Sequence, residues 1–281
     1  MRGEFVDLDD SRLYCFASGT RGVGEPIVLI HSAFTSSHLW RDLLPRLPKG
    51  HRVLVVDLLG HGRSDHPTGA DFGTHAHARR IMALLTVLGV EPACVVGHGM
   101  GAAVAAALAL QSPAHVTRLL LCNPCLLQTP GEDAGAPRSF RRLARALPLW
   151  RRLPPDWIAS ALHSALVRGY SNKLLAAQVL DVYLKAFRSD AGRDVACRQL
   201  DAVCAPSSVV ALSIGALPMP VGLMLGANDP FTPHSGEALR RSLAACVNGQ
   251  VTVHRLAGMS HAIPEEAPDR LAIAVAELLV Q

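Results

Sequence analysis

The sequence contains no long hydrophobic run and carries little net charge. No uncharged stretch reaches the roughly 18–20 residues that a membrane-spanning helix needs. The first ten residues are polar and acidic, so we expect no signal peptide there. A formal charge of +4 over 281 residues gives no reason to expect a nucleic-acid partner. Hydrophobic residues make up 49% of the chain, which allows a sizeable core in one large domain or one domain with an insertion.

Disulfide chemistry also has little support. The seven cysteines are an odd number and lie scattered through apolar segments. That usage favours a reducing compartment, so we expect a cytoplasmic protein. Cys122 and Cys125 have C-x-x-C spacing without a second pair, and we interpret them as buried residues rather than a redox or metal pair. We expect neither a metal ion nor a cofactor.

Short apolar strands alternate with helical segments in the first part of the chain. The predicted strands are an opening hairpin of Glu4–Leu8 and Arg12–Ser18, then Pro26–Ile30, Arg52–Asp57, Ala93–Val96 and Val116–Leu121. The predicted helices are Leu39–Leu47, His75–Leu88 and an Ala-rich helix from Ala102 onward. Continuous apolar strands that alternate with helices indicate an α/β fold with a mostly parallel central sheet flanked by helices.

The alternation stops at Gln128 and resumes near residue 215. A Pro- and Gly-rich stretch, Thr129–Pro137, is followed by a long helical pattern that runs to roughly Ile214. Beyond it the pattern predicts a strand at Pro220–Gly226, a helix at Gly236–Ala245, a strand at Gln250–Leu256 and a final helix at Pro264–Leu279. We therefore predict a core of residues 1–128 and 215–281 with an inserted helical cap (lid) over residues 129–214.

One recognisable motif lacks its serine. The segment after the strand at Ala93–Val96 reads Gly97-His98-Gly99-Met100-Gly101. This is the strand, turn and helix of a nucleophile elbow, G-x-S-x-G, with glycine at the serine position. No acyl-enzyme can form on Gly99, although glycine suits the strained, positive-φ turn. Three explanations are consistent with glycine at position 99: an enzyme that works without this serine, a pseudoenzyme, or a variant inactivated for study.

Four segments, in order, resemble the α/β-hydrolases with a cap domain, which include epoxide hydrolases, haloalkane dehalogenases, C–C bond hydrolases and small esterases. The segments are His31–Trp40, Asp57–Asp65, Gly226–Pro230 and Gly258–His261. The resemblance covers essentially the whole chain and implies the α/β-hydrolase fold.

The resemblance also implies roles for individual residues. Asp229 lies where the family has its catalytic acid, and His261 where it has its catalytic histidine. A carboxylate bonded to one imidazole nitrogen leaves the other nitrogen as a general base. The backbone amides of Ala33 and Met100 would form the oxyanion hole, which needs no side chain and survives the glycine at position 99.

Three further residues are candidates for substrate contact: Ser32, Phe34 and His98. Ser32 replaces the glycine that usually follows the histidine in this family. Its hydroxyl could donate to a substrate oxygen, as a threonine does in plant hydroxynitrile lyases of this fold, or bond to the local backbone or cap the next helix. His98 could also serve packing alone. Asn123 could approach His261, and we expect the motif histidines at positions 31 and 61 to brace loops.

Arginines crowd the start of the predicted cap, with apolar residues between them. They are Arg138, Arg141, Arg142, Arg145, Arg151 and Arg152. They could form a solvated helix face with an apolar underside. Alternatively, they form a docking surface for an acidic carrier protein, a CoA-type phosphate or an anionic lipid.

Three functions remain open from the sequence. The first is an enzyme that uses His261 and Asp229 as a base on a carbonyl-bearing, largely apolar small molecule, with Gly99 leaving space above the oxyanion hole. Lyase, cyclase, elimination, cofactor-free oxygenation and water-mediated hydrolysis all fit that arrangement. The second is a serine hydrolase present as an inactivated Ser→Gly variant, and the third is a non-catalytic module that binds a ligand or a partner chain.

Overall fold

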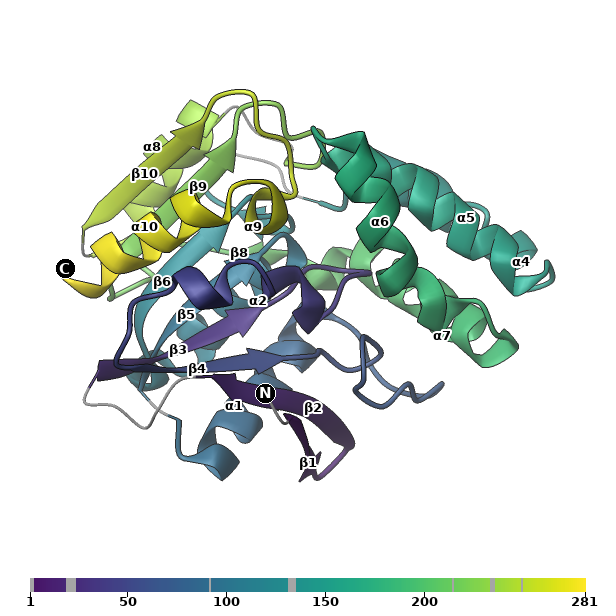
Figure 1. Cartoon of the computed structure of the whole chain (residues 1–281), viewed down its shortest axis with the longest axis horizontal. Coiled ribbons are helices and arrows are strands. Elements are labelled where there is room, and N and C mark those ends of the chain that lie inside the picture. The colour runs from purple at the N-terminus through teal and green to yellow at the C-terminus, as the bar shows by residue number, and fades with distance from the viewer. Residues whose placement is uncertain are drawn as a thin grey trace.

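The computed structural model describes residues 3–18, 24–90, 92–130, 135–213, 215–232, 236–248 and 250–281. Across these residues runs an eight-stranded sheet of order β1-β2-β4-β3-β5-β6-β9-β10 (Figure 1). Its strands are β1 (Gly3–Leu8), β2 (Ser11–Ser18), β3 (Gly24–Ile30), β4 (His51–Val56), β5 (Ala93–His98), β6 (Val116–Cys122), β9 (Val221–Gly226) and β10 (Val251–Leu256).

The sheet is mostly parallel, as the sequence predicts. Only the hairpin of β1 and β2 and the pairing of β2 with β4 are antiparallel. The other neighbours, from β4 through β3 and β5 to β10, are parallel. The inner strands are continuously apolar because both faces of the sheet are covered, and β5 is buried at every residue.

Helices cover both faces of the sheet, and alternate residues of a strand pack against helices on opposite faces. Along β3, Val28 and Ile30 belong to one core cluster, whereas Ile27 and Leu29 belong to the other. The first cluster includes residues of α1 (Thr74–Leu88), α2 (Met100–Gln111) and α8 (Gly236–Cys246). The second includes residues of α9 (Ile263–Glu266) and α10 (Pro268–Leu279). The sheet is therefore the middle layer of three.

Two predicted helices are interrupted, and a proline explains each break. The segment expected as one helix over Leu39–Leu47 forms two 3-10 helices, Ser37–Trp40 and Leu44–Arg46. Pro45 has no N–H to donate to the preceding turn, so a continuous helix cannot run through it. The final helix is split at Ala267, which takes an extended φ of −141° directly before Pro268.

The chain between β6 and β9, called the insertion below, is largely helical. Its helices are α3 (Arg138–Ala144), α4 (Leu147–Trp150), α5 (Pro155–Leu166), α6 (Lys173–Leu184) and α7 (Asp190–Cys204). Figure 1 shows α5, α6 and α7 side by side beyond one edge of the sheet layer. No helix within the described ranges is long and apolar enough to cross a membrane.

The insertion leaves and rejoins the core through a short pair of strands. Here β7 (Leu127–Gln128) pairs in parallel with β8 (Val210–Ala211). The segment expected to be helical throughout therefore ends in a two-residue strand. This pairing brings the two ends of the insertion together, so α3–α7 begin and end at the same part of the core.

Candidate active site

The turn between β5 and α2 has the geometry of a nucleophile elbow without its nucleophile. Gly99 sits between the two elements with φ 57° and ψ −117°, a region that only glycine adopts without strain. A Cβ on Gly101 would lie 2.3 Å from the carbonyl oxygen of Ile30, so glycine is needed there for close packing on β3. The sharp turn is therefore retained while the side chain at its tip is absent.

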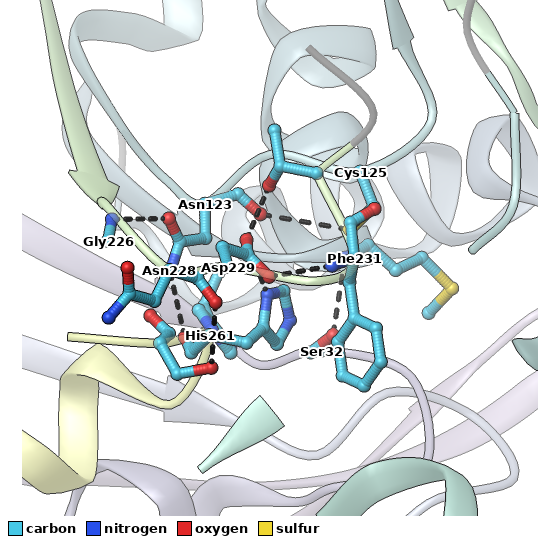
Figure 2. A network of polar contacts seen from close by, with 12 residues as sticks. Ser32, Asn123, Cys125, Gly226, Asn228, Asp229, Phe231 and His261 are labelled. Atoms are coloured by element: carbon cyan, nitrogen blue, oxygen red, sulfur yellow. Dashed lines mark hydrogen bonds and ion pairs between the residues drawn. The ribbon is translucent and has the colours of Figure 1, made fainter. Parts of the chain in front are cut away.

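Asp229 and His261 meet at the ends of β9 and β10, as the motifs predict (Figure 2). His261 Nδ1 lies 3.0 Å from Asp229 Oδ2. Because the carboxylate can only accept, Nδ1 carries the proton and Nε2 is left with a free lone pair. Asp229 also accepts from the amide of Phe231 at 2.8 Å and from the hydroxyl of Thr232. Its side chain is 3% exposed.

The charge on Asp229 is stabilised by the groups around it. Burial acts to raise the pKa of Asp229, but His261, the Thr232 hydroxyl and the Phe231 amide together hold it below the ordinary 3.8. The carboxylate is therefore ionised at neutral pH and can orient the imidazole and stabilise it when it is protonated.

Asn123 ties the two loops together through their backbones. Its Nδ2 donates to the carbonyl oxygens of Ser260 and His261, both at 3.0 Å, and its Oδ1 accepts from the amide of Gly226 at 2.9 Å. Asn123 is fully buried and adopts a positive φ of 42°. The sequence places it near His261, but its contact is with the backbone rather than the ring.

The expected open space beside Gly99 is filled. A Cβ on Gly99 would lie 2.2 Å from Ser32 Oγ and 3.0 Å from His261 Nε2. The Met100 amide donates to Ser32 Oγ over 3.3 Å, so Ser32 is bonded to one of the two expected oxyanion-hole donors. The prediction that glycine leaves room for substrate or water at this point therefore requires correction, because the serine from the neighbouring strand end fills the gap.

A mainly apolar cavity lies in front of this group. Its volume is about 30 Å³. Core and insertion both contribute to its wall. The lining residues include Ser32, Ala33, His98, Met100 and His261 from the core, and Phe140, Leu166, Gly169, Tyr170, Leu180 and Val203 from the insertion.

His98 has both a packing role and a place on the cavity. Its Nε2 bonds to the carbonyl oxygen of His261 at 2.8 Å, and the two rings lie 4.5 Å apart. Burial, reinforced by the neighbouring His261, lowers the pKa of His98 to about 3. The ring is therefore neutral at physiological pH, and it supports the loop that carries His261.

Phe34 is not brought to the cavity. Its ring is fully buried and packs edge-on against Phe140 and Phe187, at 5.4 and 6.0 Å between centroids. The expected substrate contact is absent because Phe34, with φ 58°, turns its ring into the interface between core and insertion. The residue helps to seat the insertion instead.

The remaining sequence predictions have simple outcomes. Cys122 and Cys125 are buried free thiols, and burial raises the pKa of each. His31 and His61 do brace loops through backbone contacts. The six arginines at the start of the insertion are all exposed, and none lines the cavity.

Comparisons with known proteins agree with the fold. A family model described as the alpha/beta hydrolase fold matches residues 25–268. The magnesium-chelatase 30 kDa subunit of Rhodobacter capsulatus is 31% identical over 254 residues, which cover 88% of this chain and 84% of that protein. The haloalkane dehalogenase of Mycolicibacterium paratuberculosis is 27% identical over 254 residues, covering 89% and 81%.

Other similarities are partial or concern the fold alone. The 2-hydroxymuconate semialdehyde hydrolase of Pseudomonas sp. (strain CF600) is 32% identical over 158 residues, 52% of this chain and 56% of that protein, and thus matches along little more than half its length. A solved alpha/beta hydrolase fold protein from Burkholderia ambifaria superposes with a TM-score of 0.82 at 24% identity, covering 98% of this chain and 97% of that one. The chain belongs to the α/β-hydrolase fold family.

Proposed function

We propose that this chain is an enzyme in which His261, oriented by Asp229, acts as a general base on a carbonyl-bearing, apolar small molecule, with no acyl group carried on Gly99. The observation that supports it is the 3.0 Å contact between His261 Nδ1 and Asp229 Oδ2 beside the apolar cavity. The unprotonated Nε2 lies 3.0 Å from where a Cβ of residue 99 would be. A base in that place can reach a substrate seated over the elbow.

The surrounding groups suit a reaction that develops negative charge on oxygen. The amides of Met100 and Ala33 are the proposed donors to that oxygen, and removing one such donor in other enzymes costs about 10²–10³ in rate. Lyase, cyclase, elimination and water-mediated hydrolysis all use this combination of base and donors. The wall of the cavity favours an apolar substrate, because a polar molecule would lose its hydration there without gaining partners.

We assign residues 129–214 as a cap over a core of residues 1–128 and 215–281. Support comes from the cavity, whose wall is shared between the core and α3, α5, α6 and α7 of the insertion. A buried carboxylate, Glu265, joins the two parts by accepting from Tyr170 and Tyr183 of the insertion and from Arg41 of the core. Substrate entry then requires the insertion to move relative to the core.

The test is a matched pair of histidine variants assayed on a panel of small apolar esters, lactones, diketones and cyanohydrins. His261→Ala should lower turnover by about 10²–10⁴, the usual contribution of a positioned general base. His254→Ala serves as the control, since that ring lies on β10 against Glu277, outside the cavity wall. Ligand binding without turnover, unchanged in His261→Ala, would instead support the non-catalytic binding module.

A second assay addresses the history of Gly99. The inactivated-hydrolase alternative requires a natural sequence with serine at this position, and sequencing the source gene decides it. In that case the family hydrolases, rather than a serine-independent reaction, describe the native activity.

The arginines at the start of the insertion support a phosphate-bearing carrier of the substrate, such as a CoA-type group. All six are exposed, and none has an acidic partner in the part of the chain that the structure describes. We expect CoA to bind in a salt-sensitive manner. Replacing Arg141 and Arg142 by glutamate should abolish binding while turnover of small uncharged substrates stays unchanged. Retained binding in this variant would exclude the surface.

A further inference from the structure

Ser32 and Gly99 lie next to each other at the elbow of this protein. The G-x-S-x-G pattern has serine where this chain has Gly99, and the resembling family usually has glycine where this chain has Ser32. We propose that Ser32 supplies the nucleophilic hydroxyl that residue 99 lacks, so that acyl groups of an ester-like substrate are carried on Ser32 Oγ. This inference rests on the proposed function, because it takes His261 as the base.

The position of the hydroxyl supports this role. Ser32 Oγ lies 2.2 Å from the point where a Cβ of residue 99 would sit, and His261 Nε2 lies 3.0 Å from the same point. The hydroxyl and the imidazole therefore approach the same point beside Gly99, and the hydroxyl occupies the space that a side chain at residue 99 would need. The lone pair of Nε2 has no hydrogen-bond partner among the described residues, Ser32 Oγ included. Catalytic hydrogen bonds are often long in enzymes without substrate and tighten when the substrate binds. Figure 2 shows Ser32 beside His261.

The same hydroxyl lies next to an oxyanion donor. Met100 N–H donates to Ser32 Oγ over 3.3 Å, across 68 residues of sequence. In an ordinary elbow, the amide after the nucleophile stabilises the oxyanion that forms on the attacked carbonyl. Here the same amide borders a hydroxyl that comes from the end of β3. It can stabilise negative charge on Ser32 Oγ and on the adjoining oxyanion.

The backbone of Ser32 is held by three contacts. Its carbonyl oxygen accepts from His31 Nδ1 at 2.8 Å, from Thr35 Oγ1 at 2.8 Å and from the Thr35 amide at 3.3 Å. His31 is fixed in turn, because its Nε2 accepts from the amide of Leu58 at 2.9 Å. Burial lowers the pKa of His31, which keeps the ring neutral and this tautomer in place. The backbone that carries the Ser32 hydroxyl is thus held in place.

The contacts of the Ser32 hydroxyl lie outside its own loop. The following 3-10 helix is capped by Ser36, whose Oγ accepts from the amide of His38, so Ser32 is not its N-cap. The hydroxyl of Ser32 makes its contact with α2, a different element, and it lines the cavity. Neither contact is needed to form the local turn.

The chemical step is balanced without a cofactor. Ser32 Oγ attacks the carbonyl carbon while its proton passes to His261 Nε2, which gives a tetrahedral oxyanion and an imidazolium paired with Asp229. Collapse of this intermediate breaks the bond to the leaving group, which takes the proton from His261. Water then attacks the acyl group on Ser32 by the same proton route and regenerates the hydroxyl.

The test is covalent labelling of the full chain with an alkyl fluorophosphonate, followed by peptide mass mapping. We expect one adduct, on the peptide that contains Ser32. Ser32→Ala should abolish the label and lower ester turnover by ~10³ or more. Ser36→Ala, a matched loss of a hydroxyl in the same loop, should leave labelling unchanged. A folded wild-type protein that stays unlabelled, or labels elsewhere, overturns the proposal.

The same variants distinguish failure of the Ser32 nucleophile from failure of His261 as the general base. If Ser32→Ala keeps full turnover while His261→Ala loses it, the nucleophile proposal fails and the proposed function stands. If His261→Ala retains turnover, the proposed function fails whatever Ser32 does. Circular dichroism and thermal melts of each variant exclude loss of the fold as the cause.

Discussion

A serine at position 99 should fit into the folded protein without a backbone shift only if Ser32 is removed at the same time. In Gly99→Ser the new Cβ would lie 2.2 Å from Ser32 Oγ and 2.9 Å from Ser32 Cβ, far inside van der Waals contact. Rotation of the Ser32 hydroxyl can relieve the first contact but not the second, which needs a backbone shift. The φ of 57° at this residue adds strain for any side chain.

The size of the effect follows from these two sources. A residue other than glycine in such a backbone conformation costs about 1–3 kcal/mol, and overpacking a buried site typically costs another ~1–3 kcal/mol. At about 2–4 °C per kcal/mol in a chain of this size, the single variant should melt several degrees below wild type. The double variant, with Ser32→Gly, loses the contacts with Ser32 and keeps the backbone cost and the 3.0 Å contact with His261 Nε2. It should recover part of the melting temperature.

The double variant should gain esterase activity relative to Ser32→Gly alone. The serine introduced in the double variant faces His261 Nε2 and precedes the Met100 amide, as in an ordinary elbow. Nucleophile removal costs about 10⁶ in other serine hydrolases, so a gain of ~10³ or more in p-nitrophenyl acetate hydrolysis over Ser32→Gly alone is expected. Fluorophosphonate labelling should map to position 99. A Gly99→Ser protein that melts like wild type, or a folded double variant without label, would refute the steric argument.

Three further results are expected. Asp229→Asn should lower turnover by about 10⁴ through loss of the His261 tautomer. Because the folded pKa of Asp229 is depressed, its stabilisation is present above the ordinary 3.8 and is lost as pH falls through the lower folded value. The thermal-melt deficit of Asp229→Asn should therefore shrink in acid below about pH 4. Glu265→Leu removes the buried acceptor of Tyr170, and it should destabilise the protein by about 3–5 kcal/mol in denaturant titrations and speed hydrogen exchange in α6. His98, with a pKa near 3, should show no imidazole shift between pH 5 and 8 by NMR, whereas a titration in that range would contradict its buried position.

The order of elements and the ends of the motif strands follow from sequence alone. The continuous apolar runs of β3, β4, β5, β6 and β9 indicate strands buried on both faces, and the polar motifs follow directly after them. Carboxyl ends of parallel strands lie along one edge, and Asp229 and His261 come close because β9 and β10 are parallel neighbours there. The helix breaks at Pro45 and Pro268 were not predicted, although proline's missing N–H is a local property that the sequence shows.

The relation between Ser32 and Gly99 depends on the tertiary structure. The order of the sheet puts β3 beside β5, and the close packing of Gly101 on β3 brings the two turns together. Taken alone, each residue has an ordinary structural explanation. A loop serine such as Ser32 can bond to its own backbone, and a glycine such as Gly99 relaxes a tight turn. Side-chain direction at a strand end is set by long-range packing rather than by periodicity. That is why the sequence placed Phe34 at the substrate and left a gap beside Gly99, where the folded chain buries the first and fills the second with Ser32.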